Sequence, residues 1–159
     1  MEINFKVKMT VDSMYDYMLY HSFRESFQGI FGEICGVLML IAFFATGKWL
    51  YLIAAVVLIL YLPVAIYLSA RKQVLKNEVF KEEMCYKLNE KGLEISVLEQ
   101  NGQKDWKDVT KVVSTKKNLI LYTNRITATL FPRKDLGDKY DKVVELIKAN
   151  VDASKVKIK

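Results

Sequence analysis

The sequence predicts an α+β membrane protein, in which a two-helix transmembrane hairpin is joined to a small antiparallel β-rich cytoplasmic domain that ends in a helix. Three observations support this fold class. Residues 29–70 form an almost uninterrupted apolar stretch that charged residues end abruptly. Residues 3–11 and 84–131 alternate apolar and polar side chains over short runs, which is the two-residue period of half-buried strands. Apolar side chains then recur with helical spacing over residues 140–147.

The N-terminal region, residues 1–28, is predicted to be a strand followed by an interfacial helix. Ile3–Val11 alternates apolar with polar side chains, and Thr10 or Asp12 can then cap a helix. The helix is rich in tyrosine and phenylalanine, which suits a position among lipid headgroups. An uninterrupted helical extension of the first transmembrane span fits the pattern equally well.

Two apolar segments follow, at residues 29–46 and 49–70. They are about 18 and 22 residues long, enough to cross the hydrocarbon core of a bilayer. Neither segment has the polar stripe that a core helix of a small soluble protein needs. Gly47 and Lys48 alone connect them, so the two helices must be antiparallel and both chain termini must lie on one side.

The placement of basic residues predicts which side that is. Arg71, Lys72 and Lys76 follow the second span and Arg24 precedes the first, whereas the turn offers only Lys48. The positive-inside rule therefore predicts a multi-pass protein of the cell membrane with both termini in the cytoplasm. We expect Arg71, Lys72 and Lys76 to face lipid headgroups.

Three residues of the first span are candidates for helix packing or an intramembrane polar role: Gly32, Glu33 and Gly36. A carboxylate in lipid is costly. Glu33 fits an interfacial position, a hydrogen bond to the carbonyl that Pro63 leaves free at Ile59, or ion or proton transport. Gly32 and Gly36 have the small-residue spacing that lets helices approach closely, either within the hairpin or in a homo-oligomer.

The soluble part is predicted as a connecting helix at 71–83, a β-rich domain with a C-terminal helix at 84–150, and a basic tail at 151–159. Asn101-Gly102 is expected to form a hairpin turn. Strands are expected at 84–89, 93–97, 106–115, where Trp106 begins the strand, 119–123 and 126–131. These strands would make a small, strongly bent sheet with a thin core, which the N-terminal strand can complete once the hairpin returns the chain to its starting side.

Charge and chemistry narrow the function classes. Residues 1–28 carry three basic and four acidic side chains and residues 29–70 one of each, so the net charge of +6 leaves +7 for the remainder. This excess suits an anionic leaflet, although it also suits simple solubility. Arg133 and Lys134 are a candidate anion contact where the last helix begins, or an ordinary helix-entry turn.

No catalytic, metal or cofactor site is predicted. The chain has one histidine, His21, which is expected to pack, and two cysteines, Cys35 and Cys85, without ligand spacing. Its glycines are isolated turn residues or helix-packing residues and form no phosphate loop. Basic and acidic residues are interleaved, which is unlike a nucleic-acid-binding stripe.

Three short motifs accompany the order of strand, helix, transmembrane hairpin and β-rich segment: Trp106-Lys107-Asp108-Val109, Leu121-Tyr122 and Leu130-Phe131-Pro132-Arg133. In this order and in these motifs, the chain resembles the YcxB-like membrane proteins of Gram-positive bacteria. The resemblance implies a soluble part similar to pleckstrin-homology-like domains, and it implies no established activity.

The sequence thus predicts a membrane-anchored, non-enzymatic binding or scaffolding protein rather than an enzyme. Its partners would be the lipid bilayer and a protein, a peptide or an anionic lipid, with no nucleic acid. The alternative is an oligomeric small transporter, or a transport accessory, that uses Glu33.

Overall fold

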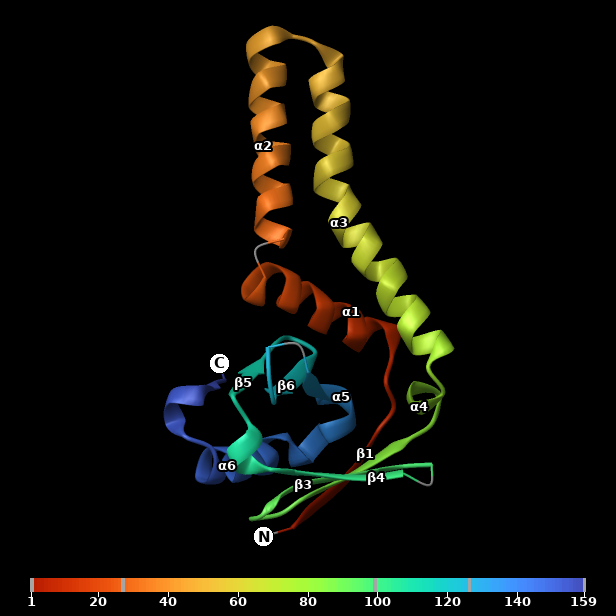
Figure 1. Cartoon of the computed structure of the whole chain (residues 1–159), viewed down its shortest axis with the longest axis vertical. Coiled ribbons are helices and arrows are strands. Elements are labelled where there is room, and N and C mark those ends of the chain that lie inside the picture. The colour runs from red at the N-terminus through yellow and green to blue at the C-terminus, as the bar shows by residue number, and fades with distance from the viewer. Residues whose placement is uncertain (1, 27, 99, 126, 159) are drawn as a thin grey trace.

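The computed structural model describes residues 2–26, 28–98, 100–125 and 127–158. Its parts are stacked along the long axis of the molecule (Figure 1). A helical hairpin stands at one end, a short helix lies crosswise beneath it, and two β-sheets with a C-terminal helix form the other end. Ile126, where a strand was predicted to begin, lies outside the described residues.

The predicted pair of long apolar helices is confirmed. Helix α2 spans Gln28–Thr46 and helix α3 spans Trp49–Lys76, and the two run antiparallel (Figure 1). The turn between them is tight because Gly47 adopts a positive φ of 67°, a conformation that glycine tolerates without steric cost. Large apolar side chains cover the outside of both helices and remain exposed.

Helix α3 continues beyond the predicted span, so the connecting helix predicted at 71–83 is found in two pieces. The first piece is the end of α3, up to Lys76. The backbone then turns at Asn77, whose side chain accepts a hydrogen bond from the backbone N–H of Val79 and caps helix α4, Glu78–Lys81.

The N-terminal strand and helix are also found. Strand β1 spans Ile3–Val7 and helix α1 spans Val11–Tyr20, with Thr10 as the cap that accepts from the backbone N–H of Ser13. A π-helical turn, His21–Glu25, follows α1 and ends at extended backbone. The predicted alternative of one uninterrupted helix leading into the first span is therefore wrong, because α1 and α2 point in different directions (Figure 1).

The first sheet has the order β1-β2-β3-β4 and is antiparallel throughout. Its other strands are β2 (Met84–Leu88), β3 (Gly92–Val97) and β4 (Gln100–Asp105). Strand β1 pairs with β2, with Phe5 opposite Tyr86. The prediction that the hairpin returns the N-terminal strand to the later sheet is thus confirmed by the strand pairing.

The predicted hairpin turn at Asn101-Gly102 is wrong. Both residues lie in β4, and the last pair before the turn is Val97 with Gln100. The β3–β4 register runs from Gly92 opposite Asp105 to Val97 opposite Gln100, so the turn comes before Asn101. Further along the pair the backbones approach closely, since a Cβ added at Gly92 would lie 2.2 Å from the carbonyl oxygen of Lys104.

The prediction that Trp106 opens a strand is wrong as well. Trp106–Asp108 forms a 3-10 helix that carries the chain from the first sheet to the second. The indole is buried, and its N–H donates to the backbone oxygen of Asn89 at 2.8 Å. This hydrogen bond holds the ring at the crossing point, where a buried tryptophan needs a partner for its N–H.

The second sheet has the order β7-β6-β5-β8, so two four-stranded sheets replace the single bent sheet that was predicted. Its strands are β5 (Lys111–Ser114), β6 (Asn118–Tyr122), β7 (Ala128–Pro132) and β8 (Val156–Lys157). Strand β8 pairs with β5 in parallel and comes from the segment predicted as a basic tail. Short helix α5 (Arg133–Leu136) and the predicted C-terminal helix α6 (Tyr140–Asn150) lie between β7 and β8 in the chain.

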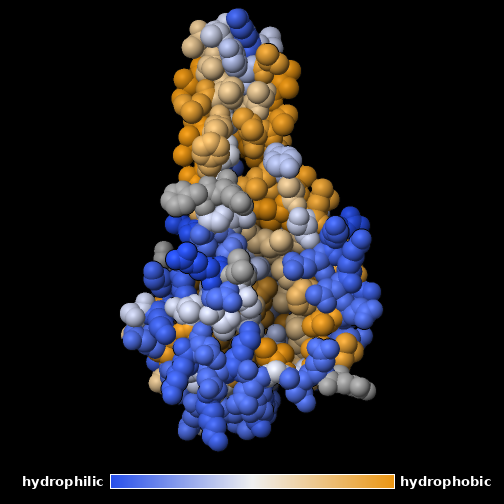
Figure 2. Space-filling model, viewed as in Figure 1, coloured by the Kyte–Doolittle hydropathy of each residue, from blue (hydrophilic) through white to orange (hydrophobic). Residues whose placement is uncertain are grey.

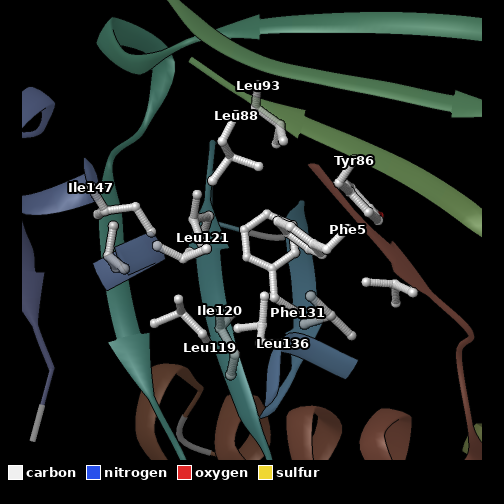
Figure 3. Packing of buried hydrophobic residues seen from close by; sticks show 14 of the residues in the cluster. Phe5, Tyr86, Leu88, Leu93, Leu119, Ile120, Leu121, Phe131, Leu136 and Ile147 are labelled. Carbon is white, nitrogen blue, oxygen red and sulfur yellow. The ribbon is translucent and has the colours of Figure 1, made fainter. Parts of the chain in front are cut away.

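The core lies between the two sheets and under α6 (Figure 3). Phe5 and Tyr86 of the first sheet meet Phe131 of the second, with ring centroids 5.2 and 5.1 Å from that of Phe131. Val143 and Ile147 of α6 are fully buried on the same core. Burial raises the pKa of the Tyr86 hydroxyl to about 12, so it stays protonated.

Candidate functional site at the junction of hairpin and sheets

Helix α1 is the element that connects the hairpin to the sheets. On one side it packs against α3, where the Tyr15 and Tyr67 rings meet edge to face at 5.6 Å. Ala70 and Val74 of α3 are buried and belong to the apolar core. On its other side α1 contacts β6 (Figure 1). A ligand that displaces α1 would therefore affect both the hairpin and the second sheet.

A buried polar network joins α1 to the second sheet. Asn118, the first residue of β6, is fully buried, and its amide donates to the Ser13 carbonyl at 2.9 Å and to the Asp16 carboxylate at 2.7 Å. The Thr115 hydroxyl donates to the same carboxylate and accepts from the Asn118 backbone N–H. Because Asn118 is fully buried and Asp16 and Thr115 are half-buried, water can replace a broken contact only in part.

Two ion pairs flank this network. Lys117 pairs with Asp12 near the start of α1, and Lys111 pairs with Glu25 at the end of the π-helical turn. The side chains of Lys111 and Glu25 are 27% and 23% exposed, so their pair is less screened than that of Lys117 and Asp12. The two pairs fix both ends of the crosswise segment to the second sheet.

Beside the network, His21 lies between two tyrosines. Its ring stacks on Tyr122 with centroids 6.1 Å apart, and the Tyr17 ring lies 5.9 Å away on the same helical segment. Burial raises the pKa of both tyrosine hydroxyls, so both stay protonated at neutral pH. These contacts agree with the predicted packing role of His21.

A groove of about 530 Å³ opens where α1 meets the lower part of α3. It is lined by Met18, Ser69, Lys72, Gln73, Lys76 and Asn77. Lys72 and Lys76 are four residues apart on one helix and so lie on the same face, one turn apart. Of the three basic residues predicted to face headgroups, the structure brings these two together and leaves Arg71 outside the groove; all three are exposed.

The predicted anion contact at Arg133 and Lys134 does not form a converging pair. The guanidinium of Arg133 lies 4.7 Å from the centroid of the Tyr140 ring, and its backbone N–H donates to the carbonyl of Lys117 at 2.8 Å. Lys134 is exposed, whereas Arg133 is half-buried. Arg133 is thus engaged within the fold, where it ties α5 to the start of α6.

The three intramembrane candidates differ in their surroundings. A Cβ added at Gly36 would lie 2.5 Å from Cγ1 of Ile59 in α3, whereas nothing lies within 4 Å of one added at Gly32. Gly36 therefore allows α2 and α3 to approach, and Gly32 faces open space. Glu33 is half-buried, and among the described residues it forms no hydrogen bond with the carbonyl of Ile59.

A second, larger groove of about 720 Å³ lies against β1 and β2, beside α5. It is lined in part by Lys6, Cys85 and Lys87, and Cys85 is a free, exposed thiol. Among the residues that the structure describes, no group of three or more histidine, cysteine or carboxylate side chains is placed to hold a metal ion.

The sequence alone indicated the charges of this junction but not its partners. Lys72 and Lys76 were found from their position after the apolar stretch. Met18, Asn118 and Tyr122 were missed because their roles depend on α1 lying crosswise between hairpin and sheet. The spacing of apolar residues predicts a strand or a helix, but it does not predict which other element that strand or helix contacts.

The fold defines a class of protein in which an apolar helical hairpin is inserted into a two-sheet α+β domain. Within this chain, residues 88–147 match the model of the family described as YcxB-like protein. The match confirms the predicted resemblance to the YcxB-like family over this part of the chain, which runs from the end of β2 through most of α6. No curated protein and no solved structure matches the chain.

Proposed function

We propose that the chain is a membrane-anchored, non-enzymatic binding or scaffolding protein. In this proposal, α2 and α3 cross the cell membrane, and the sheets lie on the cytoplasmic side, where they contact a partner. The exposure of the hairpin carries the proposal. In each apolar helix, only 11% of the most apolar stretch of 18 residues is buried within the molecule.

The chemistry of that exposed surface supports a lipid environment. Phe44, Trp49 and Leu50 near the hairpin tip are 81%, 69% and 73% exposed. Figure 2 shows apolar residues over the hairpin and hydrophilic residues over the face of the sheets that it displays. Exposed apolar area costs about 25 cal/mol per Å² in water, and a continuous belt of it therefore favours insertion into a bilayer.

Two further features support the cytoplasmic domain of the proposal. Both chain termini lie at the sheet end (Figure 1), on the same side of the hairpin as the basic residues that follow the apolar stretch of α3. Two four-stranded, mainly antiparallel sheets with a C-terminal helix also suit the pleckstrin-homology-like domain that the resemblance to Gram-positive membrane proteins implies. In such a domain the partner would be a protein, a peptide or an anionic headgroup.

Fractionation of cells that express the full chain tests the anchoring. We expect the protein to stay in the membrane pellet through washes with high salt and alkaline carbonate, and to be released by detergent. Release by carbonate would contradict the proposal. Crosslinking in the native membrane would then identify the partner; recovery of the chain without any crosslinked partner would contradict the scaffolding role.

The transporter alternative stays a prediction that rests on Glu33. Replacement of Glu33 by Gln separates the two functions because it removes a titratable group and keeps the shape of the side chain. A transporter that depends on this acid would lose ion flux in reconstituted vesicles. A scaffold would keep its crosslinked partner.

A further inference from the structure

We propose that the groove between α1 and α3 binds the phosphate-bearing headgroup of an anionic phospholipid. This inference rests on the proposed membrane anchoring, and it names the partner of the basic residues at the junction. The structure narrows the contact to one groove and to two lysines, with neutral polar groups around them.

The first argument is charge complementarity. Lys72 and Lys76 lie one turn apart on the same wall of the groove, and no acidic residue is among the described residues that line it. Among the described residues, neither lysine forms an ion pair with a carboxylate. Two unpaired ammonium groups therefore face the groove, and the oxygens of a phosphodiester can accept a charge-assisted hydrogen bond from each.

The neutral lining matches the rest of a headgroup. Ser69 and Gln73 offer a hydroxyl and an amide beside the two lysines. Asn77 uses its amide oxygen to cap α4, which leaves its NH₂ group as a donor. Met18 supplies an apolar side chain from α1. Donors around two cations, with one apolar contact, suit a phosphate linked to a glycerol.

The position of the groove along α3 points to a lipid rather than to a soluble anion. Ser69 lies at the end of the apolar stretch and Lys76 seven residues later, which is roughly 10 Å along the helix axis. The headgroup layer of one leaflet is about 5–8 Å thick. Just above the groove, Tyr67 and Leu68 are 46% and 56% exposed, where acyl chains of the same lipid would lie.

The test uses the purified full-length protein in detergent micelles with phosphatidylglycerol or phosphatidylcholine of matched acyl chains, and native mass spectrometry to count bound lipid. The groove variant is Lys72→Gln/Lys76→Gln. The control is Arg71→Gln/Lys81→Gln, which removes the same charge from exposed residues outside the groove. All four side chains are exposed, so we expect both variants to keep the circular dichroism spectrum of the wild type.

We expect the wild type and the control to retain phosphatidylglycerol about tenfold better than phosphatidylcholine, and the groove variant to lose this preference. Equal retention of both lipids by the wild type would overturn the proposal. An equal loss in both variants would also overturn it, because the attraction would then be a diffuse effect of charge.

A competition arm separates the lipid from a free phosphate. Soluble glycerol phosphate should fail to displace bound phosphatidylglycerol, because the exposed apolar side chains above the groove hold the acyl chains. Displacement by glycerol phosphate would contradict a lipid site. Failure of the anchoring itself has a different readout, namely release of the wild type from membranes by carbonate.

Discussion

The hairpin and the sheets use the same apolar side chains in opposite ways. Leu50 in α3 is 73% exposed, whereas Leu119 in β6 is fully buried. The two tryptophans differ in the same sense, with Trp49 69% exposed and Trp106 5% exposed. The sheets thus form their own apolar core, while the hairpin leaves its apolar surface to be covered by its surroundings.

The comparison shows that stability comes from two sources in this chain. Burial of a large apolar side chain contributes about 1.5–3 kcal/mol to a fold, and the sheets obtain this from contacts between distant segments. The hairpin has few such contacts and would obtain the equivalent from lipid. Helix α1 belongs to both parts, because it packs on α3 and is hydrogen-bonded to β6 through Asn118.

Deletion of the N-terminal strand tests the comparison with the largest expected effect. Strand β1 contributes Ile3, Phe5 and Val7 to the core and pairs with the whole of β2. Its removal should cost about 5 kcal/mol or more and unfold the sheets, as thermal denaturation followed by near-ultraviolet circular dichroism would show. Replacement of exposed Lys6 by alanine is the control, and we expect it to change the melting temperature little.

Substitution of Asn118 by alanine tests the link between α1 and the second sheet. It leaves the Asp16 carboxylate and the Ser13 carbonyl without their buried donor, which should cost about 2–3 kcal/mol in the free energy of unfolding. Urea denaturation of the protein in mild detergent measures the loss. A double-mutant cycle with Asp16→Asn should show coupling, and additive losses would contradict the network.

Substitution of Gly36 by leucine tests the packing of the hairpin. The added side chain would collide with Ile59, so α2 and α3 must separate, at a cost of about 1–3 kcal/mol. Gly32→Leu is the matched control, because nothing lies near an added side chain there. Unfolding by titration with denaturing detergent measures both variants. Equal losses would show that the two glycines face the same surface, contrary to the structure.

Substitution of the two tryptophans tests the comparison with the smallest expected change in stability. Trp106→Phe removes the hydrogen bond to the Asn89 oxygen and should cost about 1 kcal/mol, whereas Trp49→Phe should leave the stability of the sheets unchanged. Fluorescence in vesicles with brominated lipid adds a second measurement. We expect quenching of Trp49 and not of Trp106, and the reverse pattern would contradict the assignment of the two environments.

The sequence predicted the features that follow from long or regular patterns. The two apolar helices and their tight turn were predictable from length and charge, and the joining of the N-terminal strand to the later sheet followed from the hairpin topology. The turn at Asn101-Gly102 was mistaken because the register of the whole β3–β4 pair, and not the local preference of Asn-Gly, places the turn after Val97. Strand β8 has two residues and therefore no period to recognise.

The sequence predicted the basic residues of the candidate site but not the groove in which they lie. The position of Lys72 and Lys76 after the apolar stretch predicted that they face lipid headgroups. Only the structure shows that these two lysines line a groove and that Arg71 lies outside it. The contribution of Met18 required the crosswise direction of α1, which the sequence left open. Contacts between elements that are distant in the chain depend on how the elements pack, and a single sequence gives no pattern for that packing.

Labelling of two defined thiols, one in the sheets and one at the hairpin tip, from one side of the membrane tests the central claim most directly. Cys85 is exposed on the first sheet, and Lys48→Cys places a second thiol at the hairpin tip; Cys35 is replaced by alanine. Applied to intact cells, a maleimide that cannot cross membranes should label the thiol at position 48 and should reach Cys85 only after permeabilisation. Labelling of both thiols before permeabilisation would contradict a membrane-spanning hairpin that separates its tip from the sheets.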